Sequence, residues 1–170
     1  MTFKLKEFNN KNYKPGPLFK RLIWYFISML FFETNIPFPS KFKIFILKIF
    51  GARIYGWQIV IKPNVKIKYP WFLKIGDGSW IGERVWIDNL CDVEIDENVC
   101  ISQGVVFLTG NHDFKSPNFD LFFNKIKICK NSWIGAHSLV VGGSNVSSNS
   151  IYYAGSKISS KSKPDKIIND

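Results

Sequence analysis

One histidine stands in a short segment whose residue types suit acid–base chemistry. His112 is preceded by Gly110 and Asn111 and followed by Asp113. An imidazole titrates near neutral pH, so it can take the proton of a hydroxyl group as the hydroxyl oxygen attacks an acyl group. A lone loop histidine is more often a plain surface residue, so the surrounding elements must decide.

Asp88 and Asn89 are candidates to work with His112. A carboxylate can fix the tautomer of a histidine base. Asp88 can therefore orient His112 or bind a hydroxyl group of the substrate, and both roles stay open. The alternative is a turn, because Asp and Asn side chains often bond to turn backbone. The other histidine, His137, is interpreted as incidental, because exposed histidines are common.

The elements that must position these residues follow a period of six. Large residues recur at every sixth position, and a serine stands four residues after each of the first five. This period differs from the helical value of about 3.6 and is the hexapeptide spacing of a parallel β-helix. One apolar side chain per hexapeptide points into a triangular prism, and stacked coils bury a continuous apolar column. The large residues are Ile128, Ile134, Val140, Val146, Tyr152 and Ile158.

The same phase occurs upstream, with two interruptions. Ile75, Ile81 and Ile87 form one run, and Ile95, Ile101 and Phe107 form a second. Eight residues separate Ile87 from Ile95, and twenty-one separate Phe107 from Ile128. We interpret the second interruption as a loop over residues 109–127 that leaves the solenoid and carries His112.

Five motifs resemble the hexapeptide-repeat acyltransferases, and within them the O-acetyltransferases of colanic-acid and exopolysaccharide biosynthesis. The resemblance covers residues 50–158. The motifs are Trp80-Ile81-Gly82, Trp86-Ile87-Asp88-Asn89, Ile101-Ser102-Gln103-Gly104, Gly110-Asn111-His112-Asp113 and Trp133-Ile134-Gly135-Ala136. The resemblance implies a left-handed parallel β-helix, a homotrimer, and acyl-CoA sites in the clefts between subunits.

The resemblance also assigns residues. It implies that His112 is the catalytic base and that acetyl-CoA is the donor, with no metal. Asp88, Asn89, Asn111 and Trp86 are expected to bind substrate. Ala136, Ala154, Ser159 and Trp133 are expected to line the path of the coenzyme. For the two tryptophans, a place in the subunit interface is the alternative, and for the small residues the alternative is ordinary corner packing.

Composition excludes some classes of protein. The chain of 170 residues is 46% hydrophobic, which excludes global disorder. The net charge is +10, but no nucleic-acid recognition motif accompanies it, so nucleic acid is not an expected partner. Cys91, Cys100 and Cys129 have no CxxC spacing and are interpreted as packed residues of a protein in a reducing cytoplasm. We see no secretory signal.

Residues 1–50 form an apolar and basic N-terminal segment. Residues 18–32 predict a helix that is apolar nearly all round, and residues 41–50 predict a second. Nine Lys or Arg stand against two Glu in this segment. The helices either cap the open end of the solenoid or lie on a membrane surface, and one segment can do both. In the second case Lys41, Lys43 and Lys48 attract anionic lipid.

We therefore expect an all-β solenoid, a left-handed parallel β-helix over residues 51–158, with a short N-terminal helical segment and a polar, mobile tail over residues 159–170. The predicted function is transfer of an acetyl group to a sugar hydroxyl in cell-surface polysaccharide synthesis. The expected acceptor is a sugar or a lipid-linked glycan, and a nucleotide-linked form also stays open. The protein is expected in the cytoplasm, with peripheral contact at the inner membrane as an additional hypothesis. Two alternatives are a non-catalytic binding solenoid and a metalloenzyme of the γ-carbonic-anhydrase kind. The latter uses three histidines, whereas this chain has two.

Overall fold

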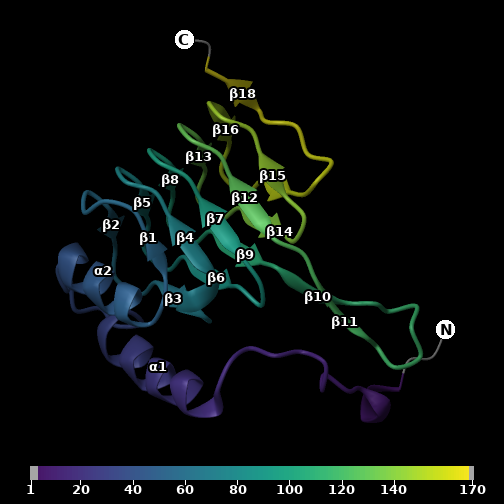
Figure 1. Ribbon diagram of the computed structural model, residues 1–170. Coiled ribbons are helices and arrows are strands. Elements are labelled where there is room, and N and C mark those ends of the chain that lie inside the picture. Colours follow the sequence, from purple (N-terminus) through teal and green to yellow (C-terminus); the bar gives the residue numbers. More distant parts are fainter. Residues whose placement is uncertain (1–3, 169–170) are drawn as a thin grey trace.

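The computed structural model describes residues 4–168 as a triangular prism of stacked coils (Figure 1). Three sheets form its sides, and the prediction of a left-handed parallel β-helix is confirmed. The first sheet contains β1 (Arg53–Ile54), β4 (Leu73–Ile75), β7 (Val93–Ile95), β12 (Ile126–Ile128) and β15 (Asn145–Val146). The second contains β2 (Val60–Ile61), β5 (Trp80–Ile81), β8 (Cys100–Ile101), β13 (Trp133–Ile134), β16 (Ser150–Tyr152) and β18 (Lys166–Ile167). The third contains β3 (Lys66–Ile67), β6 (Trp86–Asp88), β9 (Val106–Leu108), β14 (Leu139–Val141) and β17 (Lys157–Ile158).

The residues predicted to point inward form three buried columns, one on each sheet. Along the second sheet, Ile61 is in register with Ile81, Ile81 with Ile101, Ile101 with Ile134, and Ile134 with Tyr152. Each of these side chains is at most 5% exposed. The period of six therefore gave the correct inward face in every coil.

Three buried serines of the repeat, Ser132, Ser138 and Ser144, donate to backbone carbonyl groups at the corners. Ser138 Oγ donates to the carbonyl oxygens of Gly135 and Tyr153, which belong to successive coils. Ser132 and Ser144 make equivalent bonds to the coil that follows. A buried hydroxyl needs such a partner, and each bond also ties two coils together.

Helix α2 (Ser40–Ile49) covers the N-terminal end of the prism, as Figure 1 shows. Ser40 Oγ accepts from the backbone N–H of Ile61, and Lys43 Nζ donates to the carbonyl oxygens of Ile61 and Lys62 at 3.4 and 3.0 Å. Lys43 is fully buried. The prediction that Lys43 faces a membrane is therefore wrong, because its ammonium group caps the open strand edge.

Helix α1 (Leu18–Phe31) lies along the flank of the first coils. Trp24 is buried, its indole N–H donates to the carbonyl oxygen of Ile67, and its ring contacts Phe32 and Phe50. The helix therefore packs through one narrow stripe, and its opposite face is turned outward. Within residues 4–168, neither helix is long and apolar enough to cross a membrane.

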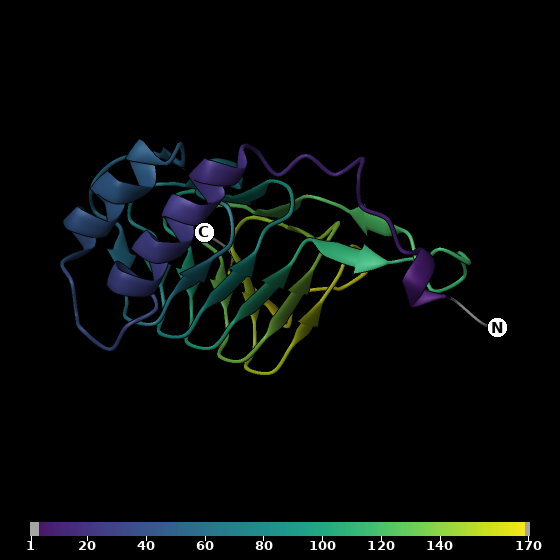
Figure 2. The ribbon, with the colours of Figure 1, turned by 90° about the horizontal axis from the view of Figure 1, so that it is seen from below.

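The segment with His112 leaves the prism as a hairpin. Strand β10 (Gly110–His112) pairs antiparallel with β11 (Leu121–Phe123), and the solenoid resumes at β12. Residues 4–17 run from α1 back along the solenoid to this hairpin, which Figure 2 shows from below. The backbone N–H of Lys4 donates to the carbonyl oxygen of Pro117 near the hairpin tip. We call residues 4–17 the strap.

The expected polar, mobile tail folds back onto the solenoid. Strand β18 pairs antiparallel with β16, with Ser150 opposite Ile167. The carboxylate of Asp165 accepts from the backbone N–H of Tyr153 at 2.7 Å. The tail therefore covers an edge of the second sheet, which otherwise exposes unpaired backbone groups.

Candidate active site

His112 is held by its own hairpin in an orientation that suits a base. Its Nδ1 atom lies 2.8 Å from the carbonyl oxygen of Phe119. A carbonyl oxygen can only accept, so in the neutral imidazole Nδ1 carries the hydrogen and Nε2 keeps its lone pair. The side chain is half-buried. The orienting group is thus a backbone carbonyl, and Asp88 does not occupy this position.

Two aromatic rings fix the plane of the imidazole. Phe119 stacks on it with centroids 4.4 Å apart and an interplanar angle of 6°. Phe8 of the strap meets it edge-on, with centroids 5.0 Å apart. Phe119 has φ +53°, a conformation that bulky residues rarely adopt. This left-handed backbone presents both the carbonyl group and the ring of one residue to His112, and backbone strain of this kind is found at functional sites.

His112 faces a cavity of about 470 Å³ between the hairpin, the strap and the solenoid. Phe8 and Tyr13 contribute from the strap, Arg21 from α1, and Leu90 from a corner of the prism. Burial raises the pKa of the Tyr13 hydroxyl, which donates to the carbonyl oxygen of Leu90 at 2.8 Å. Tyr13 also packs on Phe123 of the hairpin. The strap is therefore one wall of the cavity and is bonded to both the solenoid and the hairpin.

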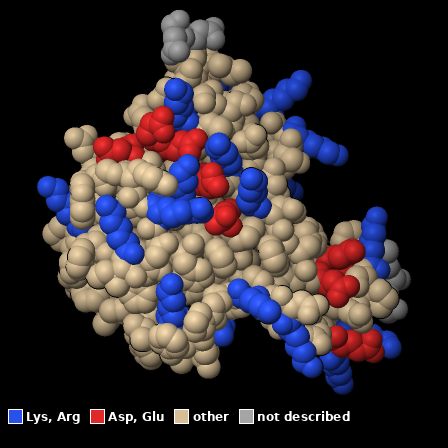
Figure 3. All heavy atoms as spheres, viewed as in Figure 1, with Lys and Arg blue, Asp and Glu red and all other residues tan. Residues whose placement is uncertain are grey.

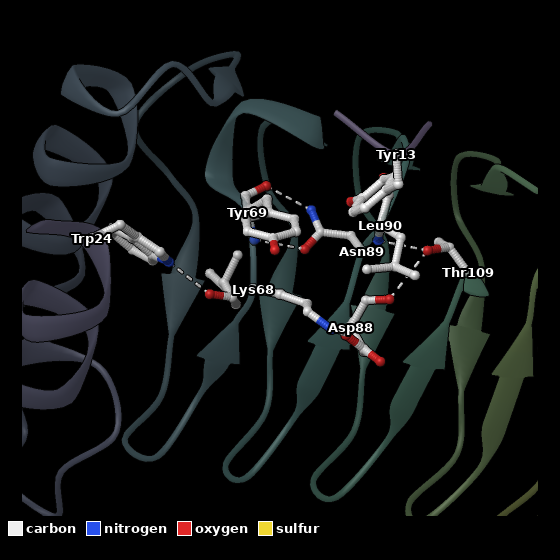
Figure 4. A network of polar contacts seen from close by, with 9 residues as sticks. Tyr13, Trp24, Lys68, Tyr69, Asp88, Asn89, Leu90 and Thr109 are labelled. Carbon is white, nitrogen blue, oxygen red and sulfur yellow. Dashed lines mark hydrogen bonds and ion pairs between the residues drawn. The ribbon is translucent and has the colours of Figure 1, made fainter. Parts of the chain in front are cut away.

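The corner over residues 88–92 forms the floor, and a polar network stiffens it (Figure 4). The Asn89 side chain accepts from the backbone N–H of Tyr69 and donates to its carbonyl oxygen. Thr109 Oγ1 accepts from the backbone N–H of Leu90 and donates to the carbonyl oxygen of Asp88. Asp88 pairs with Lys68 at 2.7 Å. Each interaction joins the corner to the preceding or the following coil.

Gly110 is required where the hairpin begins. A Cβ built on it would collide with the side chain of Leu90. The glycine thus lets the hairpin pass close to the corner, which brings His112 and Leu90 to the same cavity.

None of the four predicted substrate-binding residues lines this cavity. Asp88 is one ion pair away from it, through the lining residue Lys68. Asn89 is fully buried, and its amide is occupied by the Tyr69 backbone, so it positions the corner. Asn111 lines a different cavity, because adjacent residues of a strand point to opposite faces. Trp86 lies on the outer face of β6, 40% exposed.

Two of the four predicted coenzyme residues, Ala136 and Ala154, lie at another corner of the prism. Ala136 and Ala154 stack in successive coils at the corner between the second and third sheets, where the Gly155 N–H donates to the Ala136 carbonyl oxygen. Trp133 is exposed on β13, and its indole N–H donates to Ser102. His112 leaves the corner between the third and first sheets, and Ser159 follows β17 at that same corner. Within a single chain, the width of the third sheet therefore lies between His112 and the corner with Ala136 and Ala154.

Sequence reasoning missed Phe8, Tyr13, Arg21 and Phe119. Phe8 and Tyr13 are isolated aromatic residues in a polar stretch, which is the one signal that could have drawn attention to them. Nothing in the sequence indicates a left-handed φ at Phe119. His137 lies exposed at a corner with φ +57°, and the structure gives it no contact with the His112 cavity.

No family model matches the chain. The putative colanic acid biosynthesis acetyltransferase WcaF of Escherichia coli K12 is 30% identical over 158 residues, which cover 93% of this chain and 86% of that protein. The galactoside O-acetyltransferase of the same strain is 28% identical over 145 residues, covering 82% and 70%.

Two crystal structures share the fold. A maltose O-acetyltransferase from Clostridium difficile 630 superposes with a TM-score of 0.67 at 21% identity, over 81% of this chain and 74% of that one. The hexapeptide-repeat acetyltransferase VCA0836 from Vibrio cholerae gives 0.65 at 18% identity, over 89% and 92%, and it has also been crystallised with acetyl-CoA.

The fold and the similarity to these relatives together define a hexapeptide-repeat acetyltransferase, a CoA-dependent class of enzyme. The chain belongs to this family, and within it to the relatives of the colanic acid biosynthesis acetyltransferase WcaF. The motif resemblance seen in the sequence is therefore confirmed.

Proposed function

We propose that this protein transfers an acetyl group from acetyl-CoA to a sugar hydroxyl of a cell-surface polysaccharide, with His112 as the general base. The observation that carries the proposal is the bond between His112 Nδ1 and the Phe119 carbonyl oxygen, which leaves Nε2 as the basic atom. Similarity to WcaF and to a galactoside O-acetyltransferase supports a carbohydrate acceptor.

His112 then moves one proton in each half of the reaction. Nε2 takes the hydroxyl proton as the sugar oxygen bonds to the thioester carbonyl carbon, which forms a tetrahedral oxyanion. When the carbon–sulfur bond breaks, the imidazolium returns the proton to the leaving thiolate. A protein N–H group must meanwhile stabilise the oxyanion, and the coil with Ala136 is expected to supply it.

The corner with Ala136 and Ala154 suits the donor. Acetyl-CoA supplies the activated acetyl group, and its long arm needs an open wall with exposed backbone. Both residues have small side chains, and a Cβ at the adjacent Gly155 would meet no atom within 4 Å. Trp133 on the neighbouring strand and Ser159 are the other candidates for contact with the coenzyme.

The separation of the two corners supports a homotrimer. A second chain that places its corner with Ala136 beside the His112 cavity would complete the site, and a threefold arrangement repeats this contact three times. Trp80 and Trp133 are exposed on the second sheet and Trp86 on the third, and large apolar side chains on flat faces favour burial between subunits. We therefore propose that Trp86 contacts either the neighbouring subunit or the acceptor.

We assign the enzyme to the cytoplasmic face of the inner membrane, with α1 in peripheral contact. Apolar residues cover the outer face of α1, whereas a helix exposed to water carries polar residues there. Figure 3 shows basic but no acidic side chains over the two helices on the face it presents. At least half of each side chain is exposed at Leu18, Phe19, Leu22, Ile23, Tyr25, Phe26 and Leu30.

Two measurements test the function and the site together. Purified protein with acetyl-CoA should release CoA when glycan acceptors are added, and mass spectrometry should find one acetyl ester per acceptor. Sedimentation should give a trimer that loses activity when it is dissociated. CoA release without an acetylated acceptor, or a fully active monomer, would contradict the proposal. Binding to anionic vesicles that weakens with salt and with Lys41→Glu tests the membrane contact.

A further inference from the structure

The strap is a separate piece of chain that forms one wall of the His112 cavity. Within residues 4–17, one helical turn at Leu5–Glu7 is the only regular element, and the chain runs from α1 to the hairpin tip (Figure 1). Phe8, Tyr13 and Pro15 are half-buried and line the cavity, and the other residues of the strap are exposed. The wall therefore depends on a few contacts along an extended stretch of chain.

The contacts that hold the strap closed are weak. Two hydrogen bonds join it to the rest of the fold, from the Lys4 N–H to the Pro117 carbonyl oxygen at 3.0 Å and from the Tyr13 hydroxyl to the Leu90 carbonyl oxygen at 2.8 Å. Ordering a stretch of this length costs conformational entropy that such bonds barely offset. The closed and open strap are therefore close in free energy, as is common for segments that move in function.

Gly16 provides a hinge where the strap joins α1. It lies between Pro15 and Pro17 and has φ +99°. The ring of each proline fixes its own φ, whereas glycine rotates freely and adopts positive φ without strain. A Cβ on Gly16 would meet the Trp71 side chain at 3.6 Å, an ordinary contact distance, so the backbone conformation is what calls for glycine. Rotation of the strap is therefore concentrated at this residue.

Phe8 is the residue through which a closed strap acts on the base. Its ring meets the imidazole of His112 with centroids 5.0 Å apart and an interplanar angle of 70°. The other ring on the imidazole, Phe119, belongs to the same hairpin as His112 and stays in place when the strap moves. Opening thus removes one of the two rings that confine the imidazole and exposes that side of the cavity to water.

We propose that Phe8 is a positioning residue for the base, and that the strap which carries it is a lid hinged at Gly16. The lid opens to admit the acceptor and to release the acetylated product, and it closes for the transfer. Closure confines the imidazole of His112 and keeps water from the thioester, so that the acceptor hydroxyl takes the acetyl group. This inference rests on the proposed function, because it needs His112 to be the base.

Amide hydrogen exchange on the full chain tests the lid without any ligand. Gly16→Ala places a side chain at a positive φ, which disfavours the closed strap, so we expect the Lys4 and Phe8 amides to exchange faster by about threefold to tenfold. The amides of β16 should be unchanged. Gly51→Ala is the matched control, because Gly51 has φ +94° and also lies against Trp71 but is outside the strap. It should leave exchange in the strap unchanged.

The imidazole NMR signals of His112 test the link between the strap and the base. The chain has two histidines, and His137 lies outside the cavity and serves as an internal reference. Phe8→Leu defines the His112 signal without the second ring, and Phe8→Tyr, which keeps a ring, should stay close to the wild type. We expect Gly16→Ala to shift the His112 signal toward that of Phe8→Leu. An unshifted signal would overturn the role of Phe8.

Release of CoA from acetyl-CoA in water, with no acceptor, tests what the lid excludes. We expect Gly16→Ala to raise this rate by the factor found for amide exchange, because both follow the population of the open strap. A rate that Gly16→Ala leaves unchanged, or strap amides that exchange as slowly as those of the solenoid strands, would overturn the lid. If the raised rate persists when His112→Gln is added to Gly16→Ala, the lid stands and His112 is not the base, so the two failures are distinguishable.

Discussion

The Nδ1 atom of His112 lies 2.8 Å from the carbonyl oxygen of Phe119, seven residues further along the same hairpin. The ring of Phe119 stacks on the imidazole at the same time. One residue therefore fixes both the tautomer and the plane of the proposed base. A backbone carbonyl group can only accept, so it bonds to the Nδ1 hydrogen in both the neutral imidazole and the imidazolium.

The stacking by Phe119 can be separated from its carbonyl group. Phe119→Gly keeps the carbonyl and relieves a left-handed backbone strain of about 1 kcal/mol, which offsets the loss of a stacking contact of about 0.5–1.5 kcal/mol. We expect thermal stability to change little and kcat to fall by roughly twofold to tenfold. Phe114→Gly, at an exposed position of the same loop, is the control. Unchanged kcat would show that stacking does not hold the ring.

A change in the strap should alter the KM for the acceptor more than the KM for acetyl-CoA. Tyr13→Phe removes the hydroxyl that donates to the Leu90 carbonyl oxygen, a bond worth about 1 kcal/mol. We expect faster amide exchange in residues 4–17 and a higher KM for the acceptor, with the KM for acetyl-CoA unchanged. Tyr55→Phe, at an exposed position outside the His112 cavity, is the matched control. A rise in the KM for acetyl-CoA alone would place the strap at the donor site.

The inward column should dominate the stability of the solenoid. Ile134 is fully buried between Ile101 and Tyr152 of the adjacent coils. Ile134→Ala should lower the free energy of unfolding by about 2–5 kcal/mol, the usual cost of a large cavity in a core. Ile151→Ala, which is half-buried on the outer side of β16, should cost clearly less. Equal losses in denaturant titrations would contradict the assigned inward face.

Lys43 should make stability depend on alkaline pH. Burial lowers the pKa of Lys43 from its ordinary value of 10.5. Between the lowered pKa and 10.5 the unfolded chain binds more protons than the folded one, so stability rises with pH through that window. Lys43→Met lacks this contribution and leaves two carbonyl groups without their donor. It should be less stable than the wild type, and the difference should grow toward pH 10.5.

The exposed Lys41→Met variant is the control for that comparison. Its stability should follow the wild type across the same pH range. A wild-type curve that runs parallel to that of Lys43→Met would contradict the lowered pKa.

The solenoid could be predicted because its period is a local property of the sequence. Each hexapeptide supplies its own inward residue, so Ile134 or Val140 is placed correctly without knowledge of the other coils. His112 was found from its motif. Phe8, Tyr13 and Arg21 were not, because the strap and α1 reach the cavity of a histidine about a hundred residues further along the chain, and no period links them. Lys43 was wrongly predicted to face a membrane, because its bonds to the carbonyl groups of the strand edge form only when α2 packs on the end of the solenoid.

The turnover number of His112→Gln tests the central claim most directly. Glutamine keeps a donor and an acceptor but cannot take up a proton at neutral pH. With saturating acetyl-CoA and acceptor, we expect kcat to fall by roughly 10²–10⁴, with the KM for acetyl-CoA little changed. Lys115→Gln, an exposed residue of the same loop, should keep wild-type turnover. A His112→Gln variant with wild-type kcat would contradict the assignment of His112 as the base.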